Sequence, residues 1–227
     1  QDDLDNLQDF IDVNESLNGE PFEIGEQHWT GGPSGYGYGW AYEDEGYGRL
    51  NRLDFSNENN EISIIPESIG NLDELEFVDF SNTQITTIPA SLGDLSELSK
   101  IWWENGQLTG AIPPELGNLT NLMNLRLYNN QLTGSIPVEL GNTNLSYLDL
   151  RNNQLSGEVP LEILNMEAFY ESGAPYGDLR RIYLRHNQFT GVLPEDLCEI
   201  DLRWDSYNFI DIRNNQFCPP YPSCLEN

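Results

Sequence analysis

The sequence predicts an α/β fold built as a right-handed solenoid of about seven coils. A parallel β-sheet would line the concave face, and 3-10 or irregular segments would form the convex face. The first observation behind this prediction is a unit of about 24 residues that recurs through the 227-residue chain, as expected for stacked repeats. The second is a short alternation of apolar residues in every unit, typical of a strand. The central apolar residues of the units are Leu53, Val78, Ile101, Leu125, Leu148, Ile182 and Ile210.

The repeat units share a strand, a polar turn and a return segment. Two copies read LMNLRLYNNQLTGSIPVELGN from Leu122 and LSYLDLRNNQLSGEVPLEILN from Leu145. The strand leucines point inward at period two, and the Gly and Ile-Pro steps turn the chain onto the convex side. One position of the turn is asparagine in most units, and these side chains are predicted to form a buried ladder that hydrogen-bonds neighbouring coils. The ladder should be weaker where Thr83 and Gly106 replace the asparagine. Its members are Asn130, Asn153, Asn187 and Asn215.

The consensus LxxLxLxxNxLxGxIPxxLGxL resembles the plant-type class of leucine-rich repeats, found in receptor-kinase ectodomains and polygalacturonase-inhibiting proteins. The resemblance extends from about Leu50 to Cys224. It implies a non-enzymatic protein that binds partners through its concave or lateral face. The paired cysteines of the family's N-terminal cap are missing from this sequence.

The domain organisation predicted from the sequence is a single folding unit with two caps. Residues 1–48 form an N-terminal cap, with a helix followed by a Gly- and aromatic-rich segment; residues 49–217 hold the repeats, and residues 218–227 form a C-terminal cap. An insertion near 166–178 lengthens one repeat. A functional loop and a tolerated surface insertion are both compatible with it, because lengthening a loop costs little.

The three cysteines indicate an oxidising, extracellular or cell-surface location. Cys218 and Cys224 flank a short Pro-rich segment, a spacing that suits a local disulfide. Cys198 is either a small buried residue or an alternative partner of Cys224. We therefore expect a secreted protein.

The charge excludes several function classes. With 10 Lys and Arg against 38 Asp and Glu, the formal net charge is −28, which disfavours nucleic acid and anionic membranes and favours a monomer over an oligomer. No apolar run approaches the roughly 20 residues of a membrane span. The sequence shows no catalytic triad order, metal-ligand cluster or phosphate loop, so we expect no enzyme activity, cofactor or metal. The acidic run Glu43–Glu45 lacks the calcium-loop spacing.

The strand register places three outward-facing columns on the concave sheet. These columns hold seven of the ten basic residues but only five acids, with Arg151, Arg185 and Arg213 on successive coils. Arginine forks bind carboxylate, sulfate or phosphate, and aromatic rings add contact area. Cross-strand ion pairs alone would also explain the pattern. The candidate ligand-binding residues are Lys100, Trp102, Arg126, Tyr128, Tyr147, Arg151, Arg181, Tyr183, Arg185, Phe209 and Arg213.

The sequence thus predicts a recognition module that binds an extracellular protein, a peptide or an acidic polysaccharide through its Arg- and aromatic-lined concave face. Alternative roles are a structural or adhesive spacer or fibre subunit, an enzyme inhibitor, and an ice-binding protein. The irregular, charged concave columns do not form a flat repetitive Thr/Asn lattice, which disfavours ice binding.

Overall fold

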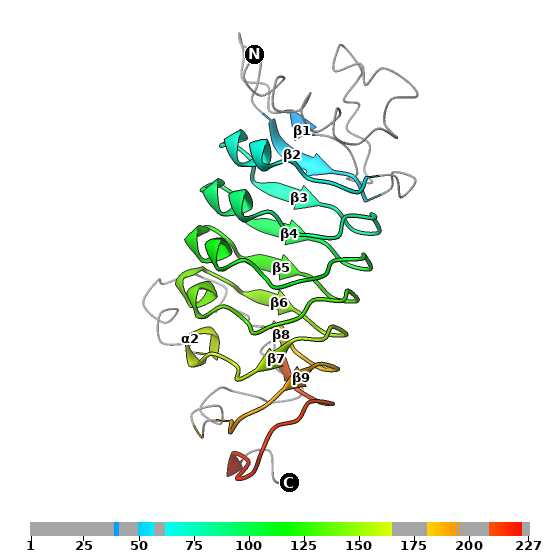
Figure 1. Cartoon of the computed structure of the whole chain (residues 1–227). Coiled ribbons are helices and arrows are strands. Elements are labelled where there is room, and N and C mark those ends of the chain that lie inside the picture. Colours follow the sequence, from blue (N-terminus) through cyan, green and yellow to red (C-terminus); the bar gives the residue numbers. More distant parts are fainter. Residues whose placement is uncertain are drawn as a thin grey trace.

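The coils stack in one direction, with the strands on one side and the 3-10 turns on the other (Figure 1). The computed structural model describes residues 39–40, 50–56, 62–164, 181–193, 195 and 209–223. The stacking follows from the sequence, because one coil can bury its apolar side only against the next.

The main sheet confirms the predicted parallel strands and their register. Seven strands run parallel: β2 (Leu50–Asp54), β3 (Phe77–Asp79), β4 (Lys100–Trp102), β5 (Asn124–Arg126), β6 (Tyr147–Asp149), β8 (Arg181–Tyr183) and β10 (Phe209–Asp211). The central apolar residues of adjacent strands are direct partners, from Leu53 and Val78 to Ile182 and Ile210. A two-residue strand, β1 (Gly39–Trp40), pairs antiparallel with β2.

The opposite side carries the 3-10 segments that the sequence predicts. They are η2 (Glu67–Asn71), η3 (Ala90–Asp94), η4 (Pro114–Asn118) and η5 (Val138–Asn142), followed by the short helix α2 (Leu161–Leu164). Each 3-10 turn follows a proline in extended conformation, whose ring fixes the entry of the chain. On one flank, β7 (Ser156–Gly157) and β9 (Gln188–Phe189) form a small second parallel sheet.

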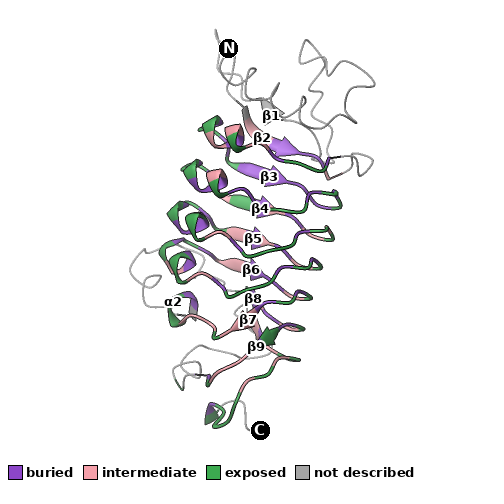
Figure 2. Ribbon diagram, viewed as in Figure 1, coloured by how far each residue is buried: buried purple, intermediate pink, exposed green. Residues whose placement is uncertain are grey.

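The core is a continuous apolar column inside the coils (Figure 2). Residues that alternate along each strand point into it, and Leu125, Leu127 and Leu148 are almost completely buried. Larger rings fill the N-terminal coils: the ring centroids of Phe55 and Phe80 lie 5.8 Å apart, and those of Phe80 and Trp103 lie 5.0 Å apart. The stack therefore shares one core over all described coils.

The buried asparagine ladder is confirmed. Asn130 accepts a hydrogen bond at Oδ1 from the amide of Leu108 (3.0 Å), and its Nδ2 donates to the carbonyls of Trp103 (2.7 Å) and Leu127 (3.1 Å). Asn153, Asn187 and Asn215 repeat this arrangement. Thr83 donates only to the carbonyl of Phe80 (2.7 Å). Each asparagine thus satisfies backbone groups of two coils that would otherwise be buried without partners.

Glycines in the 3-10 turns allow neighbouring coils to pack closely. A Cβ atom at Gly117 would overlap with the backbone carbonyl of Glu139, and one at Gly70 would lie 2.7 Å from the carbonyl oxygen of Ser91. Gly93 and Gly141 are packed in the same way against the next coil. Side chains at these positions would push the turns apart.

Several predictions about the ends and the insertion lie outside the described residues. These are the N-terminal cap helix, the insertion near 166–178, Cys198 and Cys224. Cys218 is exposed, and its residue position pairs with Val192 in an isolated parallel bridge. The disulfide between Cys218 and Cys224 stays a prediction.

We expect the substitution Gly117→Ala to destabilise the fold by about 1–3 kcal/mol, because the added methyl group must displace the neighbouring backbone. The free energy of unfolding from chemical denaturation measures this effect. Asn118→Ala, in the same turn but exposed, is the matched control and should change stability by less than about 0.5 kcal/mol. Equal values for the two variants would contradict the role of the glycine.

We expect Asn130→Ala to lower the free energy of unfolding by about 1–3 kcal/mol for each backbone group left buried without a partner. Thr83→Ala removes one hydrogen bond at the equivalent position and should cost less. Thermal and denaturant unfolding of the two variants provide the comparison. A smaller loss for Asn130→Ala than for Thr83→Ala would show that the ladder does not stabilise the stack.

Candidate ligand-binding face

The structure arranges the outward-facing residues of the sheet in three columns, as the register predicts. The first column is Arg52, Phe77, Lys100, Asn124, Tyr147, Arg181 and Phe209. The central column is Asp54, Asp79, Trp102, Arg126, Asp149, Tyr183 and Asp211. The third column is Ser56, Ser81, Glu104, Tyr128, Arg151, Arg185 and Arg213. The side chain of Phe209 lies outside the described residues.

The acids of the central column form the floor of this face. Asp54, Asp79, Asp149 and Asp211 are all buried, although their positions point outward from the sheet. Neighbouring side chains from the two outer columns cover them. A buried carboxylate needs a charged or hydrogen-bonding partner, and the arginines of this face supply it.

Each buried acid with an arginine beside it anchors that arginine's guanidinium group. Arg213 donates from Nε (2.8 Å) and Nη2 (2.7 Å) to the two carboxylate oxygens of Asp211. Arg151 Nη2 lies 3.0 Å from Asp149 Oδ2, and Arg52 Nη2 lies 2.9 Å from Asp54 Oδ2. Arg185 is farther from its partner, with Nε 3.8 Å from Asp211 Oδ2.

The two members of these pairs differ sharply in exposure. The side chains of Arg151, Arg185 and Arg213 are 27%, 35% and 64% exposed, whereas the carboxylates of Asp149 and Asp211 are 0% and 3% exposed. The negative charges therefore lie deep in the concave face, and the positive charges lie closer to solvent. The ion pairs orient the arginines without hiding them.

The pKa values of Asp149 and Asp211 shift in opposite directions because their arginine partners are placed differently. Burial raises the pKa of Asp149 to about 6, against the opposing charge of Arg151. The contact with Arg151 lacks hydrogen-bond geometry, and Asp149 Oδ2 has no hydrogen-bond partner among the described residues. Hydrogen bonds from Arg213 lower the pKa of Asp211. Burial also raises the pKa of Asp79.

Two arginines are stacked between aromatic rings of neighbouring coils. The guanidinium carbon of Arg126 lies 4.4 Å from the ring centroid of Trp102 and 4.8 Å from that of Tyr147. Asn124 joins this group, because its Oδ1 accepts from Arg126 Nε (3.1 Å) and from Trp102 Nε1 (3.2 Å). Cation–π contacts of this kind stiffen long side chains.

The second stacked arginine is Arg151, 4.6 Å from the ring centroid of Tyr128 and 5.3 Å from that of Tyr183. The rings of Tyr147 and Tyr183 contact each other, with centroids 5.6 Å apart. Burial, and then a hydrogen bond with Glu104, raises the pKa of Tyr128 to about 12, so this hydroxyl stays protonated at neutral pH. Aromatic and guanidinium groups thus form one connected layer over β4 to β8.

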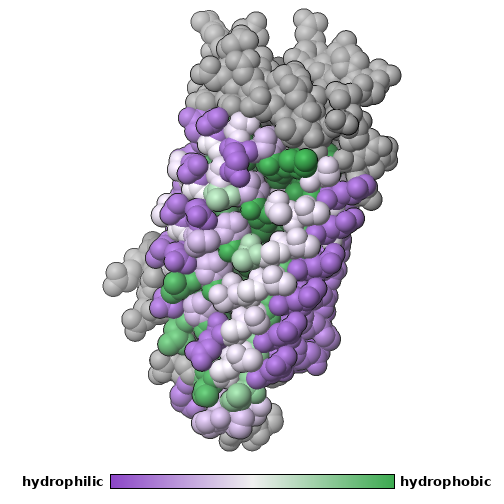
Figure 3. Space-filling view, viewed as in Figure 1, coloured by the Kyte–Doolittle hydropathy of each residue, from purple (hydrophilic) through white to green (hydrophobic). Residues whose placement is uncertain are grey.

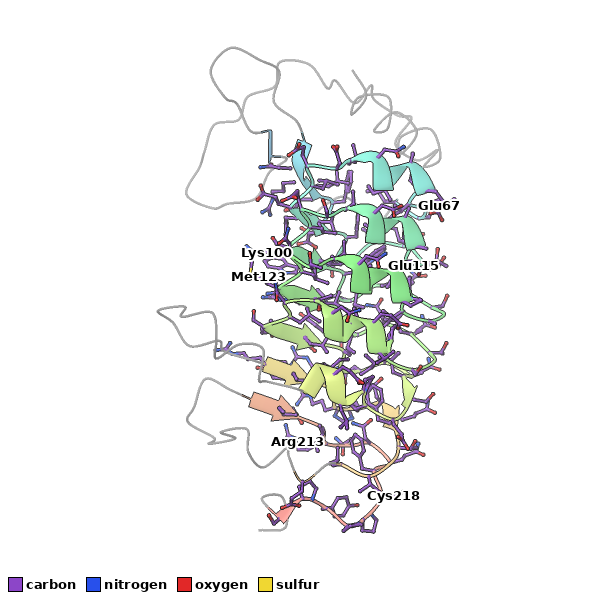
Figure 4. All side chains as sticks on the ribbon, turned by 90° about the vertical axis from the view of Figure 1, so that its left-hand side faces the viewer. Glu67, Lys100, Glu115, Met123, Arg213 and Cys218 are labelled. Carbon is purple, nitrogen blue, oxygen red and sulfur yellow. The ribbon has the colours of Figure 1, made fainter. Side chains whose placement is uncertain are left out.

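Lys100 and Arg181 stand apart from this layer. Both are exposed, and neither side chain has a hydrogen-bond or ion-pair partner in the part of the chain that the structure describes. Lys100 lies with the exposed Met123 on the strand side, opposite Glu67 and Glu115 over the 3-10 turns (Figure 4). Within the described residues, these two positive charges are therefore not neutralised by a neighbouring acid.

The sequence identified the columns but not the depth of each residue in them. Asn124, which accepts hydrogen bonds from Trp102 and Arg126, is not among the predicted ligand-binding residues, and the register places acids and arginines alike on the outward face. The described residues contain no group of three or more His, Cys, Asp or Glu side chains that could hold a metal ion. Over the same residues, no helix has the length and apolar character of a membrane span.

We expect stability to respond to pH through Asp149. Between about pH 4 and about pH 6, the folded protein holds a proton that the unfolded chain has released, so stability falls as the pH rises. Asp149→Asn removes this dependence. Relative to the wild type, the variant should therefore gain on the order of 2 kcal/mol as the pH rises from 4 to 7, measured by denaturant unfolding.

Asp211→Asn is the matched control in the same column. Because the pKa of Asp211 is lowered, this carboxylate is ionised in the folded and unfolded states over most of the same range. Its stability difference from the wild type should stay nearly constant between pH 5 and 7. The same slope in both variants would contradict the raised pKa of Asp149.

Comparison with known proteins agrees with the leucine-rich-repeat fold. The family model named Leucine Rich Repeat matches residues 121–143, 144–166 and 178–200. No curated protein matches the chain closely enough to count as a relative. Among solved structures, the chain is similar to a TDR receptor, with 32% identity and a TM-score of 0.61 over 78% of this chain and 28% of that one.

Two further structures are similar at 28% identity. The Arabidopsis receptor kinase HAESA, solved with the peptide hormone IDA and the co-receptor SERK1, gives a TM-score of 0.60 over 74% of this chain and 28% of that one. A plant ice-binding protein gives 0.56 over 67% of this chain and 47% of that one. The chain spans only about 28% of the length of these two receptor structures. The repeat, the parallel sheet and these similarities together identify the chain as a leucine-rich-repeat protein of the plant type.

Proposed function

We propose that this chain is a secreted, non-enzymatic recognition module that binds a peptide or protein carrying exposed carboxylates, through the concave face of β4 to β10. The observation that carries the proposal is the difference in depth between the charges: the acids are buried in the face, and the arginines above them are partly or fully exposed to solvent. An ion-paired surface with both members exposed would offer little net attraction.

The arginines are prepared for a ligand because their side chains are already ordered. Arg213 donates hydrogen bonds to Asp211 from Nε and Nη2. The other terminal nitrogen of its guanidinium group can therefore donate to a ligand. Arg126 and Arg151 are held by aromatic rings on both sides. Ordering these side chains in advance lowers the entropy lost on binding.

The aromatic layer favours a polypeptide ligand. Trp102, Tyr128, Tyr147 and Tyr183 are partly exposed and lie on successive coils, where their rings can contact apolar parts of a chain laid along the solenoid. The similar receptor HAESA is described in complex with a peptide hormone, which supports a peptide here. An acidic polysaccharide would use the same positive charges with less contribution from the rings.

A direct test measures binding to a pool of synthetic acidic peptides with either free or amidated C-termini. We expect Arg181→Glu to weaken binding of the selected peptide by at least about tenfold, or ~1.4 kcal/mol, because this side chain is exposed and has no ion-pair partner among the described residues. Rising salt should weaken the wild type more than the variant. Calorimetry or surface plasmon resonance gives both affinities.

Glu67→Lys is the control for position, because it reverses one exposed charge on the opposite side of the solenoid, changing the net charge by the same magnitude as Arg181→Glu but with the opposite sign. It should leave peptide affinity within about twofold of the wild type, allowing for the altered net charge. The proposal fails if Arg181→Glu binds as well as the wild type, or if acidic polysaccharides bind and none of the peptides does.

A further inference from the structure

A second regular surface runs along the flank of the solenoid, where the chain leaves the strands and returns toward the 3-10 turns. We name it the flank lattice and define it by four columns. The asparagine column is Asn82, Asn105, Asn129, Asn152, His186 and Asn214. The glutamine column is Gln84, Gln107, Gln131, Gln154, Gln188 and Gln216. The hydroxyl column is Thr86, Thr109, Thr133, Ser156 and Thr190. The last column is Thr87, Gly110, Gly134, Gly157 and Gly191.

The flank lattice faces solvent, although Ser156, Gly157, Thr190 and Gly191 are only partly exposed. Every member of the asparagine and glutamine columns is exposed, and so are the threonines of coils two to four. In Figure 3 a pale band of near-neutral hydropathy runs down the described coils, bordered by a hydrophilic band on the side where the strands end. The surface therefore repeats without interruption over five or six coils.

Backbone geometry fixes the first column. Its residues all have positive φ, between 54° and 63°, a region that asparagine adopts more readily than most residues. Their side chains also bond to one another between coils. Asn129 donates to Asn105 and Asn152 donates to Asn129, each at 2.6 Å, and Asn214 Nδ2 lies 3.1 Å from His186 Nε2.

In the glutamine and hydroxyl columns, backbone hydrogen bonds join neighbouring coils. The amide of Gln131 donates to the carbonyl of Leu108 (2.8 Å), that of Thr133 to Gly110 (2.7 Å), and that of Ser156 to Gly134 (2.7 Å). Each coil therefore stands at one strand spacing, roughly 4.8 Å, from the next. The exposed amide and hydroxyl groups form a rigid array with a constant repeat.

The flank lattice contains one histidine and otherwise only uncharged side chains, in a chain of net charge −28. None of its four columns contains Asp, Glu, Lys or Arg. By contrast, Glu115, Glu139 and Glu162 follow one another on the convex side. Charged groups bind water tightly, whereas neutral amides and hydroxyls form hydrogen bonds with water that are similar in strength to those between water molecules.

A ligand for such a surface must be uncharged, polar and periodic. We infer that the flank lattice binds ice, the crystalline form of water, through amide and hydroxyl groups repeated at the coil spacing. The absence of a Thr/Asn lattice from the concave face does not oppose this, because the lattice lies on the flank. The similarity to a plant ice-binding protein agrees with it. The inference goes beyond peptide recognition and uses a different face.

A neutral crystalline polysaccharide is a less suitable ligand. Sugar faces are bound by stacking on aromatic rings, and the four columns contain no Phe, Tyr or Trp. The aromatic residues of the described coils gather instead on the concave face and in the core. The comparison between ice and an insoluble neutral polysaccharide therefore belongs in the test.

The test uses the full chain in three forms: wild type, a double variant Gln131→Lys/Gln154→Lys, and the control Asn118→Lys/Asn142→Lys. Both double variants replace exposed amides by lysine on neighbouring coils, the first in the flank lattice and the second on the 3-10 turns. Inhibition of ice recrystallisation and capture of the protein by slowly growing ice are measured, with thermal unfolding as the check of folding.

We expect the wild type and the control to inhibit recrystallisation and to enter the ice. The flank variant should need at least about tenfold more protein for the same inhibition, ~1.4 kcal/mol, at unchanged melting temperature. Arg181→Glu should retain ice binding, which separates this inference from the concave-face proposal. The inference is overturned if the wild type stays in the liquid, if the two double variants behave alike, or if the wild type binds cellulose but not ice.

Discussion

The in-register stacking of each coil on the next is the constraint on which the rest of this structure depends. The strand ladder, the buried asparagines and the closely packed glycines all fix the same coil-to-coil distance. A residue type that recurs at one position of the repeat therefore becomes a column on the surface. Both proposed binding surfaces are columns of this kind.

Stacking also decides how charge is distributed. The central column of the sheet is crowded by its two neighbours, so acids at that position become buried, whereas the arginines beside them stay partly or fully exposed. Burying a carboxylate is costly, and at Asp149 the nearby arginine offsets this cost only in part, as the raised pKa shows. At Asp211 two hydrogen bonds from Arg213 offset it more fully.

The concave face and the flank lattice offer contrasting chemistry on one rigid support. The first combines cations with aromatic rings, and the second presents neutral amides and hydroxyls at a constant spacing. The net charge of −28 opposes association between copies of the chain. The two faces can therefore be altered separately by substitution, because they lie on different sides of each coil and share no side chains.

The sequence by itself determined the repeat, the parallel strands, the buried asparagines and the membership of the concave columns, because period-two alternation and fixed repeat spacing define these features locally. Only the tertiary structure decided which members of a column are buried, since depth depends on neighbours from other coils. It placed Asp149 beneath Arg151 and brought Asn124 to Trp102 and Arg126. It also turned scattered Asn-Gln-Thr steps into one continuous flank, because stacking aligns positions that lie more than twenty residues apart in the sequence.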